Sequence, residues 1–254
     1  MVIAIANQKG GVGKTTTAIN LGGYLAKHGR RVLLIDVDPQ GNAATCLGLA
    51  KDTLEQTIGE VLLGDVDAAT AVVATGRAGF DIIPATPDLA GTAVSLAGVM
   101  ARETRLRQAL APLIDRYDYI LIDCPPSLGL LTINGLTAAE RVLIPLQCEF
   151  LALEGLVQLK ETIELVRTHL NSTLAISGVV MTMYDGRANL ARQVVAEVRK
   201  YFPQRIFNTL IPRNIRLSEA PSHGELIYEY DPQSRGAKAY AALTEELLQR
   251  EEQE

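Results

Sequence analysis

Tryptophan is absent from the 254-residue chain, and aromatic residues make up only 5% of it. Because 48% of the residues are hydrophobic, the core has to be built from aliphatic side chains, mainly Val, Ile, Leu and Ala. A chain of this length and apolar content can bury one sizeable core. We therefore expect a single domain over residues 1–254.

Cysteine is also scarce. Cys46, Cys124 and Cys148 are widely spaced, and neither a Cys-x-x-Cys pair nor a Cys/His metal-binding spacing occurs. This pattern excludes a disulfide framework and gives no basis for a zinc or iron–sulfur site, and it is typical of a reducing compartment. We predict that Cys124 and Cys148 are small buried side chains near strand ends.

Long hydrophobic runs are missing as well. The longest apolar runs have the length of strands, and the N-terminal run, MVIAIANQKGG, is too short for a signal peptide or a membrane span. From this we expect a soluble cytoplasmic protein that does not enter a membrane.

The chain has no overall excess of positive charge, since its net charge is −5. The charge is uneven, however: residues 176–240 contain nine Lys/Arg and six Asp/Glu, a net charge of +3, which leaves −8 for the remainder. Local patches steer partners more than the total charge does. This basic region is either an ordinary solvated surface or a binding surface for an anionic partner.

Apolar runs of strand length alternate with helix-length segments. The predicted strands are residues 2–6, 31–36, 80–85, 117–123, 141–147, 175–183 and 205–211. Most of them are continuously apolar, which is typical of strands buried on both faces of a parallel sheet. Helices are predicted at 14–28, 153–170 and 190–202, and residues 243–254 form an acidic helix end or a frayed tail. The order predicts an α/β fold with a doubly wound, mostly parallel sheet and helices on both faces.

The segment NQKGGVGKTTTAIN lies between the first predicted strand and the first predicted helix, the setting that makes a glycine-rich loop a credible phosphate site. Glycines let backbone N–H groups converge on phosphate oxygens, and the helix dipole points at the same place. Lys14 is expected to reach the β- and γ-phosphates, and the Thr15 hydroxyl to ligate Mg²⁺. The predicted nucleotide contacts are Lys9, Gly10, Gly11, Val12, Gly13, Lys14, Thr15 and Thr16.

This loop carries a second lysine. The common pattern has glycine at the position of Gln8, and here Lys9 follows it. A second fixed cation beside one triphosphate would be excessive for one chain. We therefore expect Lys9 to reach the nucleotide of a second subunit, where positive charge would stabilise the transfer. The alternative is a surface lysine without a role.

Aspartates follow two of the predicted strands. LLIDVDPQGN places Asp36 and Asp38 at the end of one strand, and YILIDCPPS places Asp123 at the end of another. The carboxyl ends of parallel strands form the ligand-binding edge of an open sheet. Asp36 is expected to hold a magnesium-bound water, Asp123 to bind Mg²⁺ directly or through water, and Asp38 to position an attacking water. The alternative for a strand-end aspartate is a helix cap.

Three motifs together, KGGVGKTT, DVDPQGN and LIDCPPS, resemble the deviant-Walker P-loop ATPases of the MinD/ParA superfamily. Two later stretches, MTMYDGRANLARQVVAEVRKYF and IPRNIRLSEAPSHGELIYEYDPQSRGAKAY, are similar to its ParA/Soj chromosome-partitioning branch. The likeness covers about the whole chain. It implies that Lys9 acts in trans, Lys14 is the P-loop lysine, Thr15 is the magnesium ligand and Asp38 is the catalytic acid.

The resemblance also implies a function. Members of this branch hydrolyse ATP weakly, form an ATP-dependent homodimer with the nucleotides sandwiched between subunits, and bind double-stranded DNA without sequence preference, which places them on the nucleoid. A ParB/Spo0J-like partner stimulates their hydrolysis. The larger plasmid relatives carry a helix-turn-helix segment before the loop, and this sequence shows none, so we do not expect specific operator binding.

Nucleotide identity rests on two observations. The guanine-reading motifs NKxD and TKxD are absent, which favours ATP. IPRN, residues 211–214, resembles the family's adenine-side loop, in which Pro212 would supply an apolar face and Arg213 a stacking guanidinium beside Asn214. An ordinary surface turn is the alternative.

The basic residues form the predicted DNA surface. Contact with phosphates alone needs cations on one face and no base-reading side chains. Arg192 lies seven and eight residues before Arg199 and Lys200, so the three share a helix face. The predicted DNA contacts are Arg187, Arg192, Arg199, Lys200, Arg216 and Arg235, whereas Arg30 and Arg77 lie outside the basic region.

Other functions exist on the same fold. MinD-like division switches end in a basic amphipathic helix that binds membranes, but this chain ends in LTEELLQREEQE, which is acidic. An iron–sulfur reductase would need paired cysteines. A small-molecule ligase is not excluded by the phosphate loop, because function depends on grafted sites.

Overall fold

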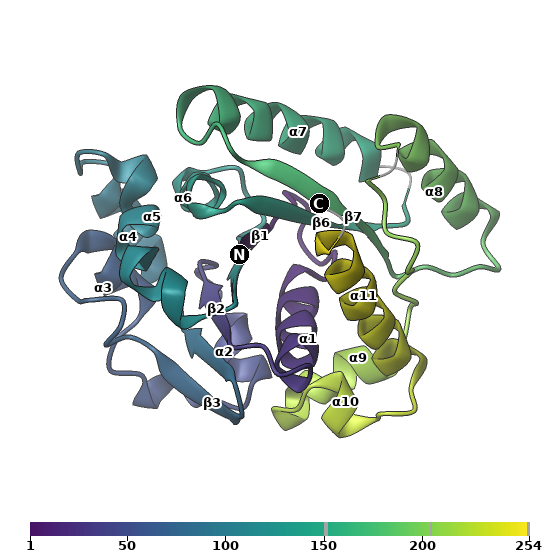
Figure 1. Ribbon diagram of the computed structural model, residues 1–254, viewed down its shortest axis with the longest axis horizontal. Coiled ribbons are helices and arrows are strands. Elements are labelled where there is room, and N and C mark those ends of the chain that lie inside the picture. Colours follow the sequence, from purple (N-terminus) through teal and green to yellow (C-terminus); the bar gives the residue numbers. More distant parts are fainter. Residues whose placement is uncertain (150–151, 204, 253–254) are drawn as a thin grey trace.

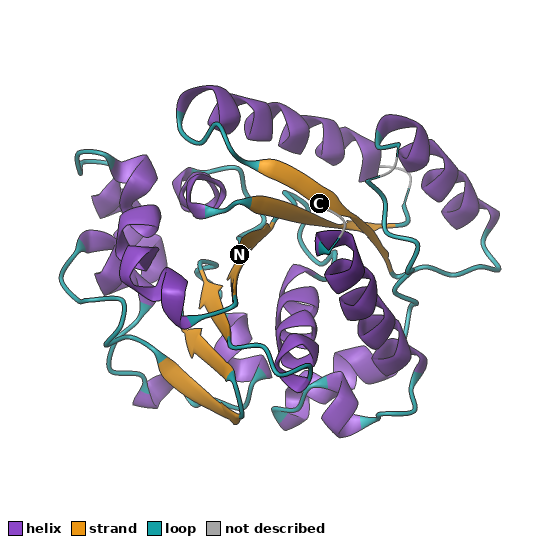
Figure 2. Ribbon diagram, in the orientation of Figure 1, coloured by secondary structure: helices purple, strands orange, loops and turns teal. Residues whose placement is uncertain are grey.

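A seven-stranded sheet crosses the molecule in the order β3-β4-β2-β5-β1-β6-β7 (Figures 1 and 2). The computed structural model describes residues 1–149, 152–203 and 205–252. β3 runs antiparallel to β4, and the other neighbours are parallel. The strands are β1 (Val2–Ile5), β2 (Val32–Asp36), β3 (Val73–Arg77), β4 (Phe80–Ile83), β5 (Tyr119–Asp123), β6 (Arg141–Gln147) and β7 (Ala175–Thr182). The predicted doubly wound, mostly parallel sheet is confirmed.

Helices cover both faces of the sheet (Figure 1). On one face lie α1, α2, α9, α10 and α11, and on the other lie α3 to α8. Their bounds are α1 (Lys14–Lys27), α2 (Asn42–Cys46), α3 (Ile58–Leu63), α4 (Leu89–Leu96), α5 (Arg105–Leu110), α6 (Leu130–Ala138), α7 (Ala152–His169), α8 (Asn189–Tyr201), α9 (Ile215–Glu219), α10 (Ile227–Tyr230) and α11 (Arg235–Glu251). Short 3₁₀ turns are η1 (Lys51–Thr53), η2 (Arg102–Thr104), η3 (Ala111–Arg116) and η4 (Ala220–His223).

The continuous apolar runs have a simple explanation in the core. Along β1, Ala4 packs into the hydrophobic cluster on one face of the sheet, whereas Ile3 and Ile5 pack into the cluster on the other. Successive side chains of a strand point to opposite faces. Because both faces are covered by helices, every position is buried and the alternation of apolar and polar residues disappears.

The predicted helices at 14–28, 153–170 and 190–202 correspond to α1, α7 and α8, with bounds that differ by one residue at most ends. α1 ends as the sequence indicates: His28 is its C-cap and Gly29 follows with φ 77°. Six of the predicted strands are also present, shortened by up to two residues at an end.

The predicted strand at 205–211 is wrong. Only isolated bridges, from Ile206 to Val179 and from Pro212 to Tyr184, tie this segment to β7 and the residues after it. Phe207 N and Ile211 N still donate to Val179 O and Met181 O of β7. Between them, the Glu246 carboxylate of α11 accepts from Asn208 N at 2.7 Å and from Thr209 N at 2.8 Å. A side chain from a helix thus takes two of the donors that a continuous strand ladder would need.

β3 lies outside the predicted strands. Its sequence, VATGR, is short and contains Gly76, which adopts φ 78° within a register shift between Ala74 and Arg77. Glycine weakens a strand signal because it marks bulges and turns. This antiparallel edge strand therefore leaves little trace in the sequence.

The acidic stretch at 243–254 is helical through Glu251, as part of α11, and residues 253–254 lie outside the described residues. Leu243 and Leu247 are buried in the same cluster as α1. Cys124 and Cys148 are buried, as predicted. Among the described residues, no helix combines the length and hydropathy needed to span a bilayer.

Candidate functional site

The phosphate loop connects β1, which lies between β5 and β6 in the sheet, to α1. Gly11 and Gly13 adopt φ 74° and 90°, conformations that glycine takes without strain, and Gly13 is the N-cap of α1. None of the described side chains caps this helix end, and its first turn has no acidic residue. Amide N–H groups without an internal partner are thus available to an anion at this position.

Neighbouring strand ends fix the shape of this loop. The Thr182 hydroxyl at the end of β7 donates to Val12 O at 2.8 Å. Asn7 is buried; its Nδ2 donates to Pro145 O of β6 at 2.8 Å, and its Oδ1 accepts from Lys9 N at 3.0 Å. The loop is therefore held in shape by β6 and β7, independently of any ligand.

Two carboxylates lie beside the loop. Asp36 and Asp123 are paired in register at the carboxyl ends of β2 and β5, and their exposures are 0% and 1%. Asp36 Oδ1 accepts from Asp38 N at 3.0 Å, and Oδ2 accepts from Ala43 N at 3.1 Å. Neither oxygen of Asp123 accepts a hydrogen bond of full geometry from the described residues, and the Thr15 hydroxyl is the side-chain donor near enough to act on its pKa.

Burial dominates the protonation of this pair. It raises the pKa of Asp36 to about 7, against the amide hydrogen bonds from Asp38 and Ala43. It also raises the pKa of Asp123 well above its usual value, and the neighbouring Asp36 charge adds to the increase. Lys14 responds in the opposite sense, because burial lowers its pKa more than the charges of Asp123 and Asp38 raise it. A bound cation would stabilise the charged forms of the two carboxylates, and a bound anion would stabilise the charged form of Lys14.

A divalent cation fits the Asp36–Asp123 pair. An unpartnered buried carboxylate is costly unless it is paired or coordinates a metal. No group of three His, Cys, Asp or Glu that could hold a metal occurs among the described residues. That finding agrees with Mg²⁺, which keeps several waters and commonly takes one or two protein ligands together with phosphate oxygens. Thr15, at the start of α1, lies close enough to lower the pKa of Asp123.

Lys14 points inward, as expected for a P-loop lysine. It is 6% exposed, and its Nζ donates to Lys9 O at 3.3 Å. Asp38 is partly exposed and lies in the turn after β2, where its Oδ1 accepts from Gln40 N at 2.9 Å. The structure therefore brings Lys14, Thr15, Asp36, Asp38 and Asp123 to one edge of the sheet.

Lys9 has a partner in its own chain that the sequence pattern alone did not reveal. Its Nζ lies 2.6 Å from Glu149 Oε2, and the Gln147 amide donates to the other oxygen of that carboxylate. Glu149 lies just after β6, as Asp38 lies just after β2, and Asp123 is the last residue of β5. The carboxyl ends of parallel strands converge at one edge of the sheet, so the run LQCE at the end of β6 could have identified Glu149 from the sequence.

A cavity of about 310 Å³ adjoins the phosphate loop. The loop contributes Val12, Gly13 and Thr16, and the opposite wall includes Pro212, Arg213 and Asn214. The remaining wall is formed by Thr182, Met183, Ile211, Leu217, Ser218, Pro221 and Tyr240. The Asn214 side chain also caps α9, since its Oδ1 accepts from Arg216 N at 2.8 Å. The adenine-side residues therefore lie at the wall of a pocket that is large enough for a flat ring.

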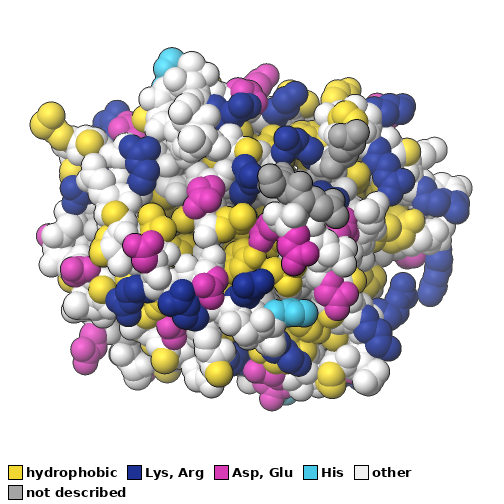
Figure 3. All heavy atoms as spheres, viewed as in Figure 1, with side chains coloured by type: hydrophobic (Ala, Val, Ile, Leu, Met, Phe, Trp, Pro, Cys, Tyr) yellow, Lys and Arg dark blue, Asp and Glu magenta, His cyan; other side chains and the backbone are white. Residues whose placement is uncertain are grey.

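The basic residues lie on the surface and differ in their partners. Arg187, Arg192, Arg199, Lys200 and Arg235 are exposed, and Lys200 pairs with Glu197 at 2.8 Å. Arg216 contacts Glu219 at 2.9 Å and Asp231 at 3.5 Å, so its charge is largely compensated. Figure 3 shows Lys and Arg side chains along the right-hand edge, the side on which α8 lies in Figure 1.

The chain is similar to known proteins over most of its length. A family model described as an AAA domain matches residues 1–176. The sporulation initiation inhibitor protein Soj of Bacillus subtilis (strain 168) is 56% identical over 246 residues, covering 97% of each chain. The chromosome partitioning protein ParA of Myxococcus xanthus (strain DK1622) is 55% identical over 250 residues, covering 98% of this chain and 88% of the relative.

A solved structure shares the fold over its full length. Cobyrinic acid a,c-diamide synthase from Mycobacterium smegmatis, with bound ADP and magnesium, has a TM-score of 0.87 and is 42% identical; the match covers 99% of this chain and 95% of that one. The Soj and ParA relatives are more similar in sequence, over nearly the same length. The chain therefore belongs to the Soj/ParA family of chromosome-partitioning ATPases.

Proposed function

We propose that this chain binds ATP with Mg²⁺ in the pocket between the phosphate loop and residues 212–214, and hydrolyses it to ADP and phosphate. Residues 9–16 surround the phosphates, with the Lys14 ammonium on the β- and γ-phosphates. The Thr15 hydroxyl ligates Mg²⁺, and Asp36 and Asp123 hold it directly or through water. Asp38 orients the attacking water.

One observation carries this proposal: the buried Asp123 carboxylate, with only the Thr15 hydroxyl near enough to act on it as a donor among the described residues, faces Lys14 beside an uncapped helix N-terminus. These buried charges destabilise the free protein, and a bound cation together with a bound anion would offset that cost. Magnesium bound to a nucleotide phosphate supplies both charges. The ADP and magnesium of the mycobacterial structure, at 42% identity, support the same interpretation.

Asp123→Asn tests this cost directly. The folded-state pKa of Asp123 is raised, so the folded protein binds more protons than the unfolded chain and its stability falls as pH rises through that range. Asparagine removes the ionisation. We expect the variant to gain about 1–2 kcal/mol in free energy of unfolding. The gain should be absent below the ordinary pKa of an aspartate and should grow as pH rises from there toward the raised pKa of the folded state.

The same variant should lose the effect of Mg²⁺ on ADP affinity, measured by calorimetry with and without the metal. A matched control is Asp88→Asn, since Asp88 is exposed at the N-cap of α4, where water solvates its charge. Retention of the full magnesium effect in Asp123→Asn would remove Asp123 from the metal site.

We further propose an ATP-dependent homodimer in which Lys9 contacts the nucleotide of the second subunit. In the single chain, the Lys9 carbonyl faces Lys14, whereas its ammonium contacts Glu149. The two groups are 36% and 46% exposed, and such pairs are worth about 0–1 kcal/mol. The Lys9–Glu149 pair can therefore exchange for a contact with a phosphate at small cost.

Lys9 and Glu149 should separate binding from dimerisation. Lys9→Gln is expected to bind ATP within about threefold of the parent, because an exposed pair contributes little, and to remain monomeric. Glu149→Gln frees the lysine and should leave dimerisation intact or strengthen it. Sedimentation with ATP and nucleotide titrations measure the two properties. A monomer affinity for ATP that falls equally in Lys9→Gln and Lys14→Ala would place Lys9 in its own site.

The dimer, in our proposal, binds double-stranded DNA through the exposed cations near α8 and α11 without reading sequence. A single copy presents few of these charges, and two linked copies gain from effective concentration. Arg216 contributes least, because Glu219 and Asp231 already compensate it. A ParB/Spo0J-like protein then stimulates hydrolysis and releases the DNA, and the protein resides on the nucleoid.

Arginine-to-glutamate changes should map this surface. In the ATP state, Arg187→Glu, Arg192→Glu and Arg235→Glu are each expected to weaken binding to every duplex alike. They should also reduce the log–log salt slope by about 0.9 for each phosphate that the protein ceases to neutralise. Anisotropy titrations over a salt series measure both quantities. Arg30→Glu is the exposed control. Weaker binding in Arg30→Glu with none of this effect in the other three would move the DNA surface elsewhere.

A further inference from the structure

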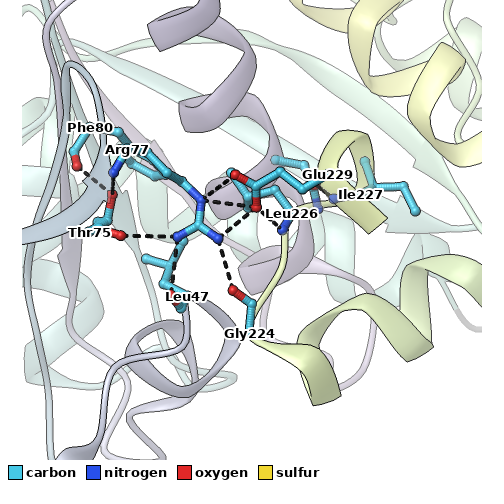
Figure 4. A network of polar contacts seen from close by, with 9 residues as sticks. Leu47, Thr75, Arg77, Phe80, Gly224, Leu226, Ile227 and Glu229 are labelled. Carbon is cyan, nitrogen blue, oxygen red and sulfur yellow. Dashed lines mark hydrogen bonds and ion pairs between the residues drawn. The ribbon is translucent and has the colours of Figure 1, made fainter. Parts of the chain in front are cut away.

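Arg77 lies at the centre of a polar network that joins distant parts of the chain (Figure 4). Its Nε and Nη2 donate to the Glu229 carboxylate, at 2.8 Å and 2.7 Å. Its Nη1 donates to Leu47 O at 3.1 Å and to Thr75 O at 3.2 Å, and Nη2 also donates to Gly224 O at 2.8 Å. The side chain is 14% exposed, and all five guanidinium N–H groups have acceptors.

The backbone of the edge strand β3 sets the direction of the Arg77 side chain. The register shift between Ala74 and Arg77 turns the end of β3, and the Thr75 hydroxyl fixes the bend by donating to Phe80 O at 2.6 Å and accepting from Arg77 N at 3.3 Å. Bulges of this kind redirect a side chain. Arg77, which the charge pattern places outside the basic region, is therefore a partly buried structural cation.

One end of the network leads to residues 36–38, which contain Asp36 and Asp38 and which we call the acidic turn. Leu47 is the C-cap of α2, and at the other end of this five-residue helix Ala43 N donates to Asp36 Oδ2 at 3.1 Å. The other Asp36 oxygen accepts from Asp38 N at 3.0 Å. A displacement of α2 along its axis would therefore shift the Asp36 carboxylate and, through it, the backbone that carries Asp38.

The other end of the network leads to the cavity of about 310 Å³ beside the phosphate loop, which we call the base-side pocket. Gly224 ends η4, and its N donates to the carbonyl of Pro221, which lines the 310 Å³ cavity. Gly224 also touches the α2 side directly, since a Cβ on Gly224 would lie 2.6 Å from Gly48 Cα. Arg77 thus binds α2 and the pocket wall to each other at the point where their backbones meet.

We propose that Arg77 is a positioning residue that couples the base-side pocket to the acidic turn, so that a nucleotide in the pocket orders α2 and with it Asp36 and Asp38. This inference rests on the proposed function. Arginine suits the role because its planar fork satisfies three carbonyls and a carboxylate at once, which lysine cannot do. Arg77 is not among the residues that line the pocket, so its effect must pass through Gly224 and Leu47.

Amide hydrogen exchange with ADP and Mg²⁺ tests the coupling without requiring hydrolysis. In the parent, ADP should slow exchange both at the start of α1 and across residues 42–49. In Arg77→Lys, the protection at α1 should remain and that across 42–49 should disappear. Arg105→Lys is the matched control, because Arg105 likewise binds the last carbonyls of a short helix, Leu62 O at 2.9 Å and Leu63 O at 2.7 Å, far from the nucleotide.

Single-turnover hydrolysis provides the second readout. Arg77→Lys should slow it by about 10-fold through misplacement of Asp38, whereas Arg105→Lys should not. In an Asp38→Ala background, the Arg77 change should add little. Glu229→Gln, which keeps the carbonyl contacts, should give a milder form of the same pattern if Arg77→Lys does not fold.

The outcomes separate this inference from the proposed function. Full protection of residues 42–49 in Arg77→Lys, or equal effects in Arg77→Lys and Arg105→Lys, would overturn the coupling while the nucleotide site stands. Absence of ADP protection at α1 in the parent would overturn the nucleotide site and the coupling together.

Discussion

Asp38→Ala is expected to bind ATP and to hydrolyse it about 100-fold or more slowly than the parent, because a positioned acid or base commonly contributes that much. The magnesium-site carboxylates and the phosphate loop stay unchanged in this variant. Asp38 is the partly exposed member of the acidic group, and the hydrogen bond that its side chain accepts from a described residue comes from Gln40 N in its own turn. The ATP-bound state should therefore accumulate. Single-turnover hydrolysis and ATP titration measure the two properties.

A matched control exists for the local turn. Asp67 accepts from Ala69 N at 2.9 Å, the same side-chain-to-backbone contact that Asp38 makes with Gln40, but far from the phosphate loop. Asp67→Ala should thus report the cost of removing such a turn alone. Unchanged hydrolysis in Asp38→Ala, or equal slowing in both variants, would refute the assignment.

Lys14→Ala is expected to weaken nucleotide binding by about 30-fold or more, since removing one member of a buried charge pair costs about 2–5 kcal/mol. The charge of the Lys14 ammonium acts on Asp123, and both groups are buried. Its removal abolishes the phosphate contact and leaves two carboxyl groups without compensation, so the variant should also favour their protonated forms. Calorimetric titration with ADP and Mg²⁺ measures the affinity.

Lys27→Ala is the control for charge on the same helix. Lys27 is the basic residue in the last turn of α1, and its Nζ lies 4.4 Å from the centre of the Tyr228 ring. Nucleotide affinity should stay at the parental value in this variant. An ADP affinity in Lys14→Ala close to that of Lys27→Ala would exclude Lys14 from the phosphate site.

Most of the fold and the centre of the site could be predicted because they depend on local patterns. The interiors of strands such as β5 and β6 are continuously apolar, and burial on both faces requires this. The phosphate loop depends on glycines at fixed spacing, and Asp36 and Asp123 end adjacent strands. The convergence of parallel strands then places these residues together without further information.

The remaining features depend on long-range partners. Glu246 prevents a strand at 205–211 from a position 37 residues away from Thr209. Lys9 pairs with Glu149, which lies 140 residues later in the sequence, and Arg77 pairs with Glu229, which lies 152 residues later. Charge counting places Arg77 outside the basic region and Arg216 among the predicted DNA contacts, because a sequence does not show which carboxylate folds against which cation. Such pairs are visible only once the fold is known.

Nucleotide-dependent DNA binding tests the central claim most directly. Anisotropy of a labelled duplex of arbitrary sequence would be measured with the parent chain under ATP, ADP and no nucleotide, each with Mg²⁺, with Asp38→Ala used to hold the ATP state. We predict binding with ATP that fades steeply with salt, weak binding in the other two states, and no preference among duplex sequences. Equal binding with ATP and ADP would contradict the switch, and ATP turnover that requires an amide donor and ignores DNA would indicate a ligase instead.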